Sequence, residues 1–206
     1  MKTDLAADIS CKCSKCRITV SNGRAVQHFL CACEDCRQAL QWCHIKGGDK
    51  PDPIPDLYYV SADIITSQGN EYMGTFKLRD NGRSTRLYCK NCYSLIAVDH
   101  PSYKSNILLF FPKHCKSGCD LSFPPTAYIF MDDYSEDIGP FPTQDIPLFH
   151  SFKYEQERKR LATLQGVKTF REPRGEIVGT TFSTFLETLG PATILNLEKG
   201  KNLLAD

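Results

Sequence analysis

The chain has 206 residues, of which 41% are hydrophobic and 24% are charged. This balance is typical of a folded globular protein, and it excludes an intrinsically disordered chain. Lys and Arg number 25 against 24 Asp and Glu, a formal net charge of +1, so no nucleic-acid partner is expected. We expect a small-molecule or protein partner instead.

The cysteine content indicates metal binding. Residues 1–8 contain no apolar run typical of a signal peptide, and no apolar stretch is long enough to cross a bilayer, so we expect a cytoplasmic protein without a membrane segment. In that reducing compartment, the eleven cysteines are better explained by metal ligation than by disulfides. Seven of them also fall into tight clusters.

The first cluster, Cys11-Lys12-Cys13-Ser14-Lys15-Cys16, precedes an alternating segment at 17–20. An Asn22-Gly23 turn and the apolar segment 25–30 follow, which together predict a β-hairpin. Such a hairpin would carry Cys11 and Cys13 at one end and return the chain to Cys31. Cys16 is either a third ligand or a small buried residue at the start of a strand, and we favour the buried residue.

The second cluster holds three thiols within six residues: Cys31, Cys33 and Cys36. A Cys-x-Cys pair on an extended segment sends both sulfurs to one face, and the Cys-x-x-Cys step returns a third. Because zinc prefers four ligands, the last position is open to water or a substrate thiol unless another side chain closes it. Cys43 and His44 are candidates for that closure, although neighbours on a strand point to opposite faces, so at most one would reach.

Residues 34–41 favour a short helix whose first turn carries Cys36. Arg37 follows directly, and two roles are open for it. It pairs with an acid such as Glu34 or Asp35, or it holds a carboxylate of a molecule bound at the metal.

The middle of the chain predicts a series of strands at 57–60, 72–78, 84–88, 95–98 and 106–111, with a turn at 80–82. The strand at 84–88 runs into Cys89-Lys90-Asn91-Cys92. We expect a knuckle there, with backbone amides that hydrogen-bond metal-bound sulfurs.

The order of these motifs is Cys-x-Cys, then Cys-x-Cys-x-x-Cys-Arg, then a hairpin and Cys-x-x-Cys. It resembles the glutathione-dependent formaldehyde-activating enzyme family, which also includes centromere protein V. The likeness covers approximately residues 8–150, and the segments 64–69, 127–130 and 145–148 agree with it. The resemblance implies a mainly β, zinc-bound β-tent fold with short helices.

The resemblance also implies two zinc ions per chain. A closed structural site would use Cys11, Cys13, Cys89 and Cys92, and the second zinc would be held by Cys31, Cys33 and Cys36 and used with glutathione. The sequence departs from the family at Ser14 and Tyr93, where glycine is common. It departs again over residues 38–44, where the family often has a glycine and an aromatic residue, so the substrate pocket is expected to differ.

We divide the chain into a zinc-binding domain at 1–150 and a partly helical C-terminal extension at 151–206. The extension has helical patterns at 154–164 and 181–189, and it packs on the sheet, pairs with another subunit or covers the second zinc. Before it, His114, Cys115 and Cys119 form a third zinc site or, as we favour, a loop with free thiols.

Two functions follow from these patterns. As an enzyme, the protein is a carbon–sulfur lyase that acts on glutathione or a glutathione conjugate, with Cys31, Cys33 and Cys36 as the catalytic metal site and Arg37 as a binding residue. Alternatively, it is a non-catalytic binding module whose fold is stabilised by zinc and which acts through its surface or its C-terminal extension. Assembly into a homo-oligomer stays open.

Overall fold

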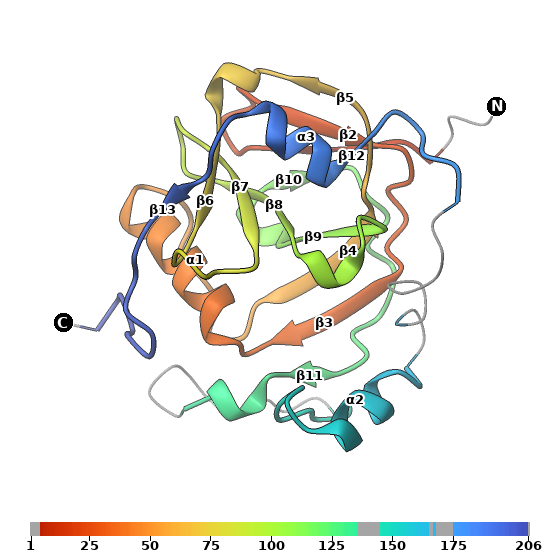
Figure 1. The fold of residues 1–206 in the computed structure, drawn as a ribbon, viewed down its shortest axis with the longest axis vertical. Helices are drawn as coiled ribbons and strands as arrows, with labels where there is room; N and C mark the ends of the chain where they lie inside the picture. Colours follow the sequence, from red (N-terminus) through yellow and green to blue (C-terminus); the bar gives the residue numbers. More distant parts are fainter. Residues whose placement is uncertain (1–4, 136–144, 165–166, 168–174, 206) are drawn as a thin grey trace.

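Two β-sheets make up most of the structure, a computed structural model that describes residues 5–135, 145–164, 167 and 175–205 (Figure 1). The smaller sheet has the strand order β10 (Lys116–Ser117), β1 (Ala7–Ser10), β2 (Arg17–Val20), β5 (Asp63–Gln68) and β12 (Thr180–Thr181). The larger sheet has the order β11 (Tyr128–Ile129), β3 (Gln27–Cys31), β4 (Asp56–Ser61), β9 (Ile107–Phe110), β8 (Leu95–Asp99), β7 (Thr85–Cys89), β6 (Met73–Lys77) and β13 (Thr193–Ile194). The fold is therefore mainly β, as predicted.

The helices are short and lie around the sheets. They are α1 (Glu34–Ile45), α2 (Glu155–Leu161) and α3 (Phe182–Thr188), with single 3-10 turns η1 (Asn70–Tyr72), η2 (Pro101–Tyr103), η3 (Pro112–His114) and η4 (Met131–Asp133). Among the described residues, no helix has the length and apolar character needed to cross a membrane.

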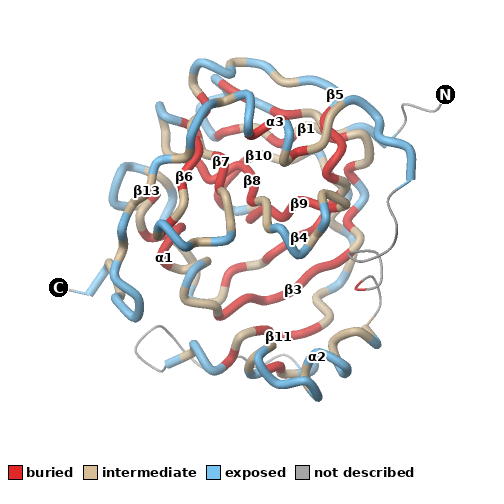
Figure 2. Tube along the Cα trace, in the orientation of Figure 1, coloured by how far each residue is buried: buried red, intermediate tan, exposed pale blue. Residues whose placement is uncertain are grey.

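The larger sheet is buried on both faces, and its strands form much of the buried interior (Figure 2). One face packs against the smaller sheet, where Val60, Leu108 and Phe110 meet Ile9 and Ile18. The other face packs against α1. The residues that build this second core include Phe29, Leu57, Leu109, Phe111, Ala39 and Leu40. Side-chain alternation explains the division, since Leu57 and Tyr59 face one core and Tyr58 and Val60 face the other.

The predicted hairpin of 17–20 with 25–30 is wrong. β2 pairs with β1 and β5 in the smaller sheet, whereas β3 pairs with β4 and β11 in the larger one. The Asn22-Gly23 segment therefore carries the chain from one sheet to the other. The hairpin partner of β2 is β1, a strand that the sequence pattern did not predict.

The helix expected at 34–41 is confirmed, but it continues to Ile45 and includes Trp42, Cys43 and His44, which we had taken as extended. Strands are present in each of the five predicted regions between residues 57 and 111. The two helices expected in the C-terminal extension are also present, as α2 and α3.

The last described segment, 175–205, adds an edge strand to both sheets. β12 pairs with β5, and β13 pairs in parallel with β6. Between them, α3 buries Phe182, Phe185 and Leu186 in the core between the sheets. Of the roles left open for the extension, packing on the sheets is thus found, while the division at residue 150 stays a prediction.

Candidate metal centres

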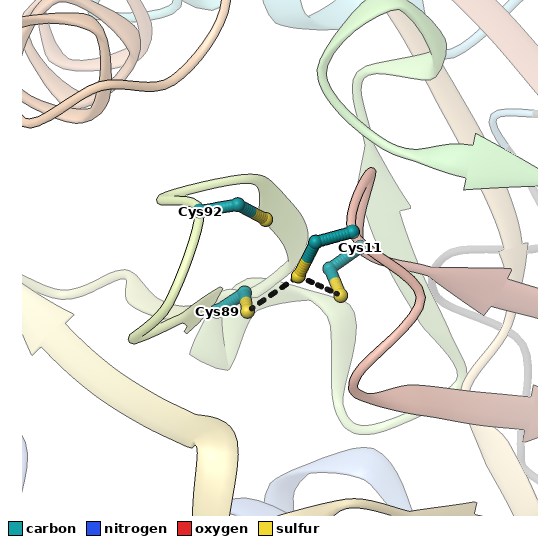
Figure 3. Close-up of side chains that lie close together, drawn as sticks. Cys11, Cys89 and Cys92 are labelled. Carbon is teal, nitrogen blue, oxygen red and sulfur yellow. Dashed lines mark hydrogen bonds between the residues drawn. The ribbon is translucent and has the colours of Figure 1, made fainter.

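The first group of thiols joins the two sheets. Cys11 and Cys13 follow β1 of the smaller sheet, Cys89 ends β7 of the larger sheet, and Cys92 lies in the turn after it. All four Sγ atoms lie within 4.8 Å of one another. Figure 3 shows the sulfurs of Cys11, Cys89 and Cys92 turned toward a common centre. The sequence had brought these four together only through the family resemblance.

The spacing of these sulfurs fits a four-coordinate metal ion. The Sγ atom of Cys13 lies 3.4 Å from that of Cys11 and 3.8 Å from that of Cys89. Zinc–sulfur bonds of about 2.3 Å in a tetrahedron place sulfurs roughly 3.8 Å apart. Backbone and side-chain donors also reach the sulfurs: the Cys16 amide donates to Cys11 Sγ at 3.3 Å, and Asn91 Nδ2 donates to Cys13 Sγ at 3.4 Å. The group can therefore hold a metal ion with four protein ligands.

The turns that carry these thiols need left-handed backbone at two residues that are not glycine. Ser14 has φ of 62° and Tyr93 has φ of 53°. Their amides donate to the carbonyl oxygens of Cys11 and Cys89, at 3.0 and 2.9 Å. The two positions at which the resemblance leads us to expect glycine thus adopt the conformation that glycine favours.

The second group consists of Cys31, Cys33 and Cys36, whose Sγ atoms also lie within 4.8 Å of one another. Cys31 ends β3, and Cys33 caps α1, because its Sγ accepts a hydrogen bond from the Cys36 amide at 3.2 Å. The Sγ atoms of Cys31 and Cys36 are 3.8 Å apart. Cys31 is buried, whereas Cys33 and Cys36 are half-buried. This group can hold a metal ion with three protein ligands.

The thiols of the second group differ in their pKa values. Hydrogen bonds to Cys33 and Cys36, together with burial, raise the pKa of Cys31 well above its ordinary value. Hydrogen bonds from Cys31 and Cys33 lower the pKa of Cys36 well below it, and the charge of Arg86 acts in the same direction. The Cys36 thiolate therefore forms first.

Neither Cys43 nor His44 completes the second group. They lie seven and eight residues beyond Cys36 on α1, which corresponds to about 10–12 Å along a helix. Cys43 is buried, and His44 Nδ1 donates to the Gly48 carbonyl oxygen at 3.0 Å. Among the described residues, the group thus has three ligands.

Arg37 is anchored to the backbone around the second group. One terminal nitrogen donates to the carbonyl oxygens of Ala32 and Asp133. Glu34 and Asp35, the acids expected to pair with it, instead form ion pairs with Arg79 at 3.0 and 2.7 Å. The role of Arg37 in holding a substrate carboxylate stays a prediction.

Polar side chains that the sequence analysis missed surround the second group. Burial raises the pKa values of Tyr59 and Tyr103, and the charges of Cys31 and Cys36 add to the effect. The two tyrosine hydroxyl oxygens are 3.5 Å apart. Burial also lowers the pKa of His100, whose ring centroid lies 5.4 Å from that of Tyr103.

Arg86 is the buried cation of this region. It lies on β7, and its terminal nitrogen donates to the carbonyl oxygen of Asp35, the residue before Cys36, at 3.3 Å. Burial acts to lower its pKa, while the charges of Cys36, Asp35 and Cys33 oppose that effect. No local motif links Arg86, His100, Tyr59 or Tyr103 to a cysteine, so the sequence offered no signal for them beyond polar residues within or next to apolar strands.

The remaining cysteines belong to neither group among the described residues. Cys16 is 1% exposed, as expected of a small buried residue. Burial raises the pKa of Cys115 to about 12 and also raises that of Cys119, so both are protonated thiols. His114, Cys115 and Cys119 do not form a third metal group in the part of the chain that the structure describes.

No protein-family model matches the chain, and no curated protein matches its sequence.

Proposed function

We propose that the chain is a carbon–sulfur lyase-type enzyme of the glutathione-dependent formaldehyde-activating kind, with zinc in both cysteine groups and a β-tent fold. Three features support this proposal: the order of the cysteine motifs, the mainly β fold, and the gathering of seven cysteines into a group of four and a group of three. Glutathione or a glutathione conjugate is the substrate that we assign to it.

The difference between the two cysteine groups carries the proposal. The first group offers four sulfurs, which satisfy a tetrahedral ion and suit a structural site. The second offers three, and two of these belong to half-buried residues. Because the described residues offer no fourth ligand, we infer that a metal ion there takes that ligand from a bound molecule. A thiol is the ligand that a site of soft sulfurs prefers.

Zinc at the second group would supply positive charge that favours the thiolate form of a bound thiol. Cys31, Cys33 and Cys36 would hold it, and Arg37 would offer its positive charge to a substrate carboxylate. In the reaction with formaldehyde, the sulfur forms a bond to the carbonyl carbon and the thiol proton ends on the carbonyl oxygen. No oxidant or reductant is needed.

His100 is the side chain that we assign to the developing oxygen. Its Nδ1 accepts a hydrogen bond from the Ser102 amide at 3.0 Å, so the neutral ring carries its proton on Nε2. Burial and the charges of Arg83 and Arg86 lower its pKa, which keeps the ring neutral at pH 7. A neutral imidazole can donate this hydrogen bond without adding a positive charge to the site.

The test is the reaction of glutathione with ¹³C-formaldehyde, followed by NMR at enzyme concentrations far below those of the substrates. We expect the zinc-loaded protein to accelerate exchange between the free and the sulfur-bound carbon. Cys36→Ser should abolish this acceleration, and Cys119→Ser, a change at a thiol outside both groups, should leave it intact. Equal rates with all three proteins would reject formaldehyde as the electrophile. The same comparison with larger glutathione conjugates would then test the lyase activity, and equal rates there too would reject it.

The alternative is a non-catalytic module. It is favoured by one observation, that the first cysteine group joins strands of both sheets and so can act as a staple. In that case the second group would also be structural, and no glutathione conjugate would be turned over.

A further inference from the structure

Arg86 is a buried cation without a carboxylate partner. Arg86 is 3% exposed, and it forms no ion pair within the described part of the chain. Its hydrogen bonds go to the carbonyl oxygens of Ser84 and Asp35, both at 3.3 Å. Its guanidinium also lies 5.9 Å from the ring centroid of Phe76. None of these direct partners carries a negative charge.

Burying such a charge is unfavourable unless an opposite charge lies nearby. Arginine does not escape this cost by losing its proton, because its guanidinium stays charged in proteins. Two sources of negative charge act on Arg86, the Asp35 carboxylate and the cysteine group that contains Cys36. The carboxylate is exposed and already paired with Arg79, which leaves the cysteine group, and the Asp35 carbonyl to which Arg86 donates belongs to the residue before Cys36.

The charges of the metal-bound group match this requirement. Three thiolates and a divalent ion together carry a formal charge of −1, which one guanidinium neutralises. A fourth ligand that arrives as a thiolate then brings the whole assembly to −1 rather than −2. Water or a neutral thiol leaves it at zero.

We propose that Arg86 is the counter-charge of the second cysteine group, a positioning residue that stabilises its metal-bound, three-thiolate state and so allows an anionic thiolate as the fourth ligand. This inference deepens the proposed function and rests on its metal site. It does not depend on which conjugate is turned over.

Two other arginines provide the contrast. Arg79 also reaches the first turn of α1, but Glu34 and Asp35 already neutralise it. Arg83 precedes the same strand β7 and donates to Ser102 Oγ at 3.1 Å in an exposed position. Arg83 is therefore the matched control, a cation of the same segment without a buried charge to balance.

The first measurement is the affinity of the full chain for cobalt(II), titrated against a chelator, with Cys36→Ser to identify the signal of the first site. Loss of a residue that supports a metal ligand without binding the metal itself lowers metal affinity by roughly 10–100-fold. We expect such a loss at the second site alone in Arg86→Met, a smaller loss in Arg86→Lys, and none in Arg83→Gln. Unchanged cobalt affinity in Arg86→Met would overturn the proposal.

The second measurement separates this role from simple packing. In the zinc-loaded chain, Arg86→Met should lower the melting temperature. In a chain whose Cys31, Cys33 and Cys36 are all serine, the same change should leave the melting temperature equal or raise it, since methionine then replaces a buried charge that has no partner. Equal losses in both backgrounds, or failure of Arg86→Met to fold in either, would make Arg86 a structural residue and overturn the proposal.

Calorimetry of glutathione binding tests the proposed function separately from the role of Arg86. If glutathione does not bind the wild-type chain while Arg86→Met still lowers cobalt affinity, the thiol substrate is rejected and the counter-charge stands. If glutathione binds wild type and Arg86→Met equally well at saturating zinc, the part of the inference that concerns the fourth ligand is overturned.

Discussion

At the scale of single residues, the two turns that carry the first cysteine group depend on a backbone conformation that their side chains disfavour. Ser14 and Tyr93 both have positive φ. A left-handed conformation costs a residue with a Cβ atom on the order of 1 kcal/mol. The turn geometry at the cysteines therefore prevails over the preference of the residue that follows them.

Ser14 gives the first prediction. Its side chain is exposed, and its hydroxyl accepts a bond from Lys116 Nζ at the surface, which contributes little. We expect Ser14→Gly to raise the free energy of unfolding by about 0.5 kcal/mol and Ser14→Val to lower it by more than 1 kcal/mol, measured by urea denaturation of the zinc-loaded protein.

Ser122 is the control for this pair, because it is exposed and does not have positive φ. Ser122→Gly should lower stability slightly, since glycine only adds freedom to the unfolded chain there. A loss of stability in Ser14→Gly as large as in Ser122→Gly would contradict the strain that we assign to Ser14.

His114 gives a prediction about pH. It is 2% exposed, and its Nε2 has no hydrogen-bond partner among the described residues. Burial lowers its pKa from 6.5 to about 4. Between these values the unfolded chain binds a proton that the folded chain does not, so stability is complete above about pH 6.5 and falls as the pH drops toward 4.

The contribution of His114 should amount to about 3 kcal/mol between pH 7 and pH 4. Because cysteine protonation acts in the same range, the measurement is the difference between wild type and His114→Leu, by urea denaturation at several pH values. We expect the variant to gain on the wild type as the pH falls. A difference that stays constant with pH would show that His114 titrates in the fold as it does in the unfolded chain.

At the scale of elements, α1 is held from three sides. η4 reaches its beginning, where Asp133 accepts from the Glu34 amide at 3.0 Å. The aromatic rings of Trp42, Tyr88 and Tyr93 pack together and connect it to the turn of the first cysteine group. The C-terminal segment covers a third side, where Gln38 donates to the carbonyl oxygens of Glu198 and Lys201, both at 2.8 Å.

The third prediction concerns this C-terminal contact. The segment also bonds to α1 through Gly200 and Asn202. Because α1 carries Cys36 in its first turn, removal of residues 198–206 should weaken cobalt binding at the second site several-fold and leave the first site unchanged. A chain that lacks only residues 204–206 keeps these contacts and is the control. Equal cobalt affinity in the two shortened chains would remove the segment from any role in the site.

Periodicity located most strands but did not choose their partners. Residues 17–20 and 25–30 both have strand patterns, and the Asn22-Gly23 turn between them favours a hairpin. Pairing is decided instead by burial: Ile18 and Val20 enter the core between the sheets, whereas Phe29 faces the core beneath α1. Contacts of this kind join residues far apart in sequence, which a local pattern does not contain.

The candidate site was predictable to a similar extent. Cys31, Cys33 and Cys36 are neighbours in sequence, so their spacing alone indicated a shared ion. Arg86 lies on β7 and His100 directly follows β8, and only strand pairing brings them near Cys36. The sequence therefore identified the candidate ligands and missed the residues that surround them.

At the scale of the whole molecule, the two cysteine groups should contribute differently to folding. The first joins segments that are 76 residues apart, between Cys13 and Cys89, and it links the two sheets. The second lies within six consecutive residues. We therefore expect metal binding at the first group to be coupled to folding far more strongly.

The fourth prediction follows from this difference. Cys89→Ser should remove most of the folding stability, and Cys36→Ser should remove much less, as measured by thermal melts of the zinc-loaded proteins. Cys16→Ser is the control for a buried cysteine outside both groups. Equal melting temperatures for Cys89→Ser and Cys36→Ser would contradict the separation into a structural and a functional site.

The central claim is that the second group binds a metal ion and accepts a thiol as its fourth ligand. X-ray absorption at the zinc edge of the two-zinc protein, without and with saturating glutathione, tests it most directly. We expect the sulfur count at the second site to rise from three to four, which increases the average over both sites from 3.5 to about 4. An unchanged spectrum, with no heat of glutathione binding, would contradict the claim and leave the second group as a structural site.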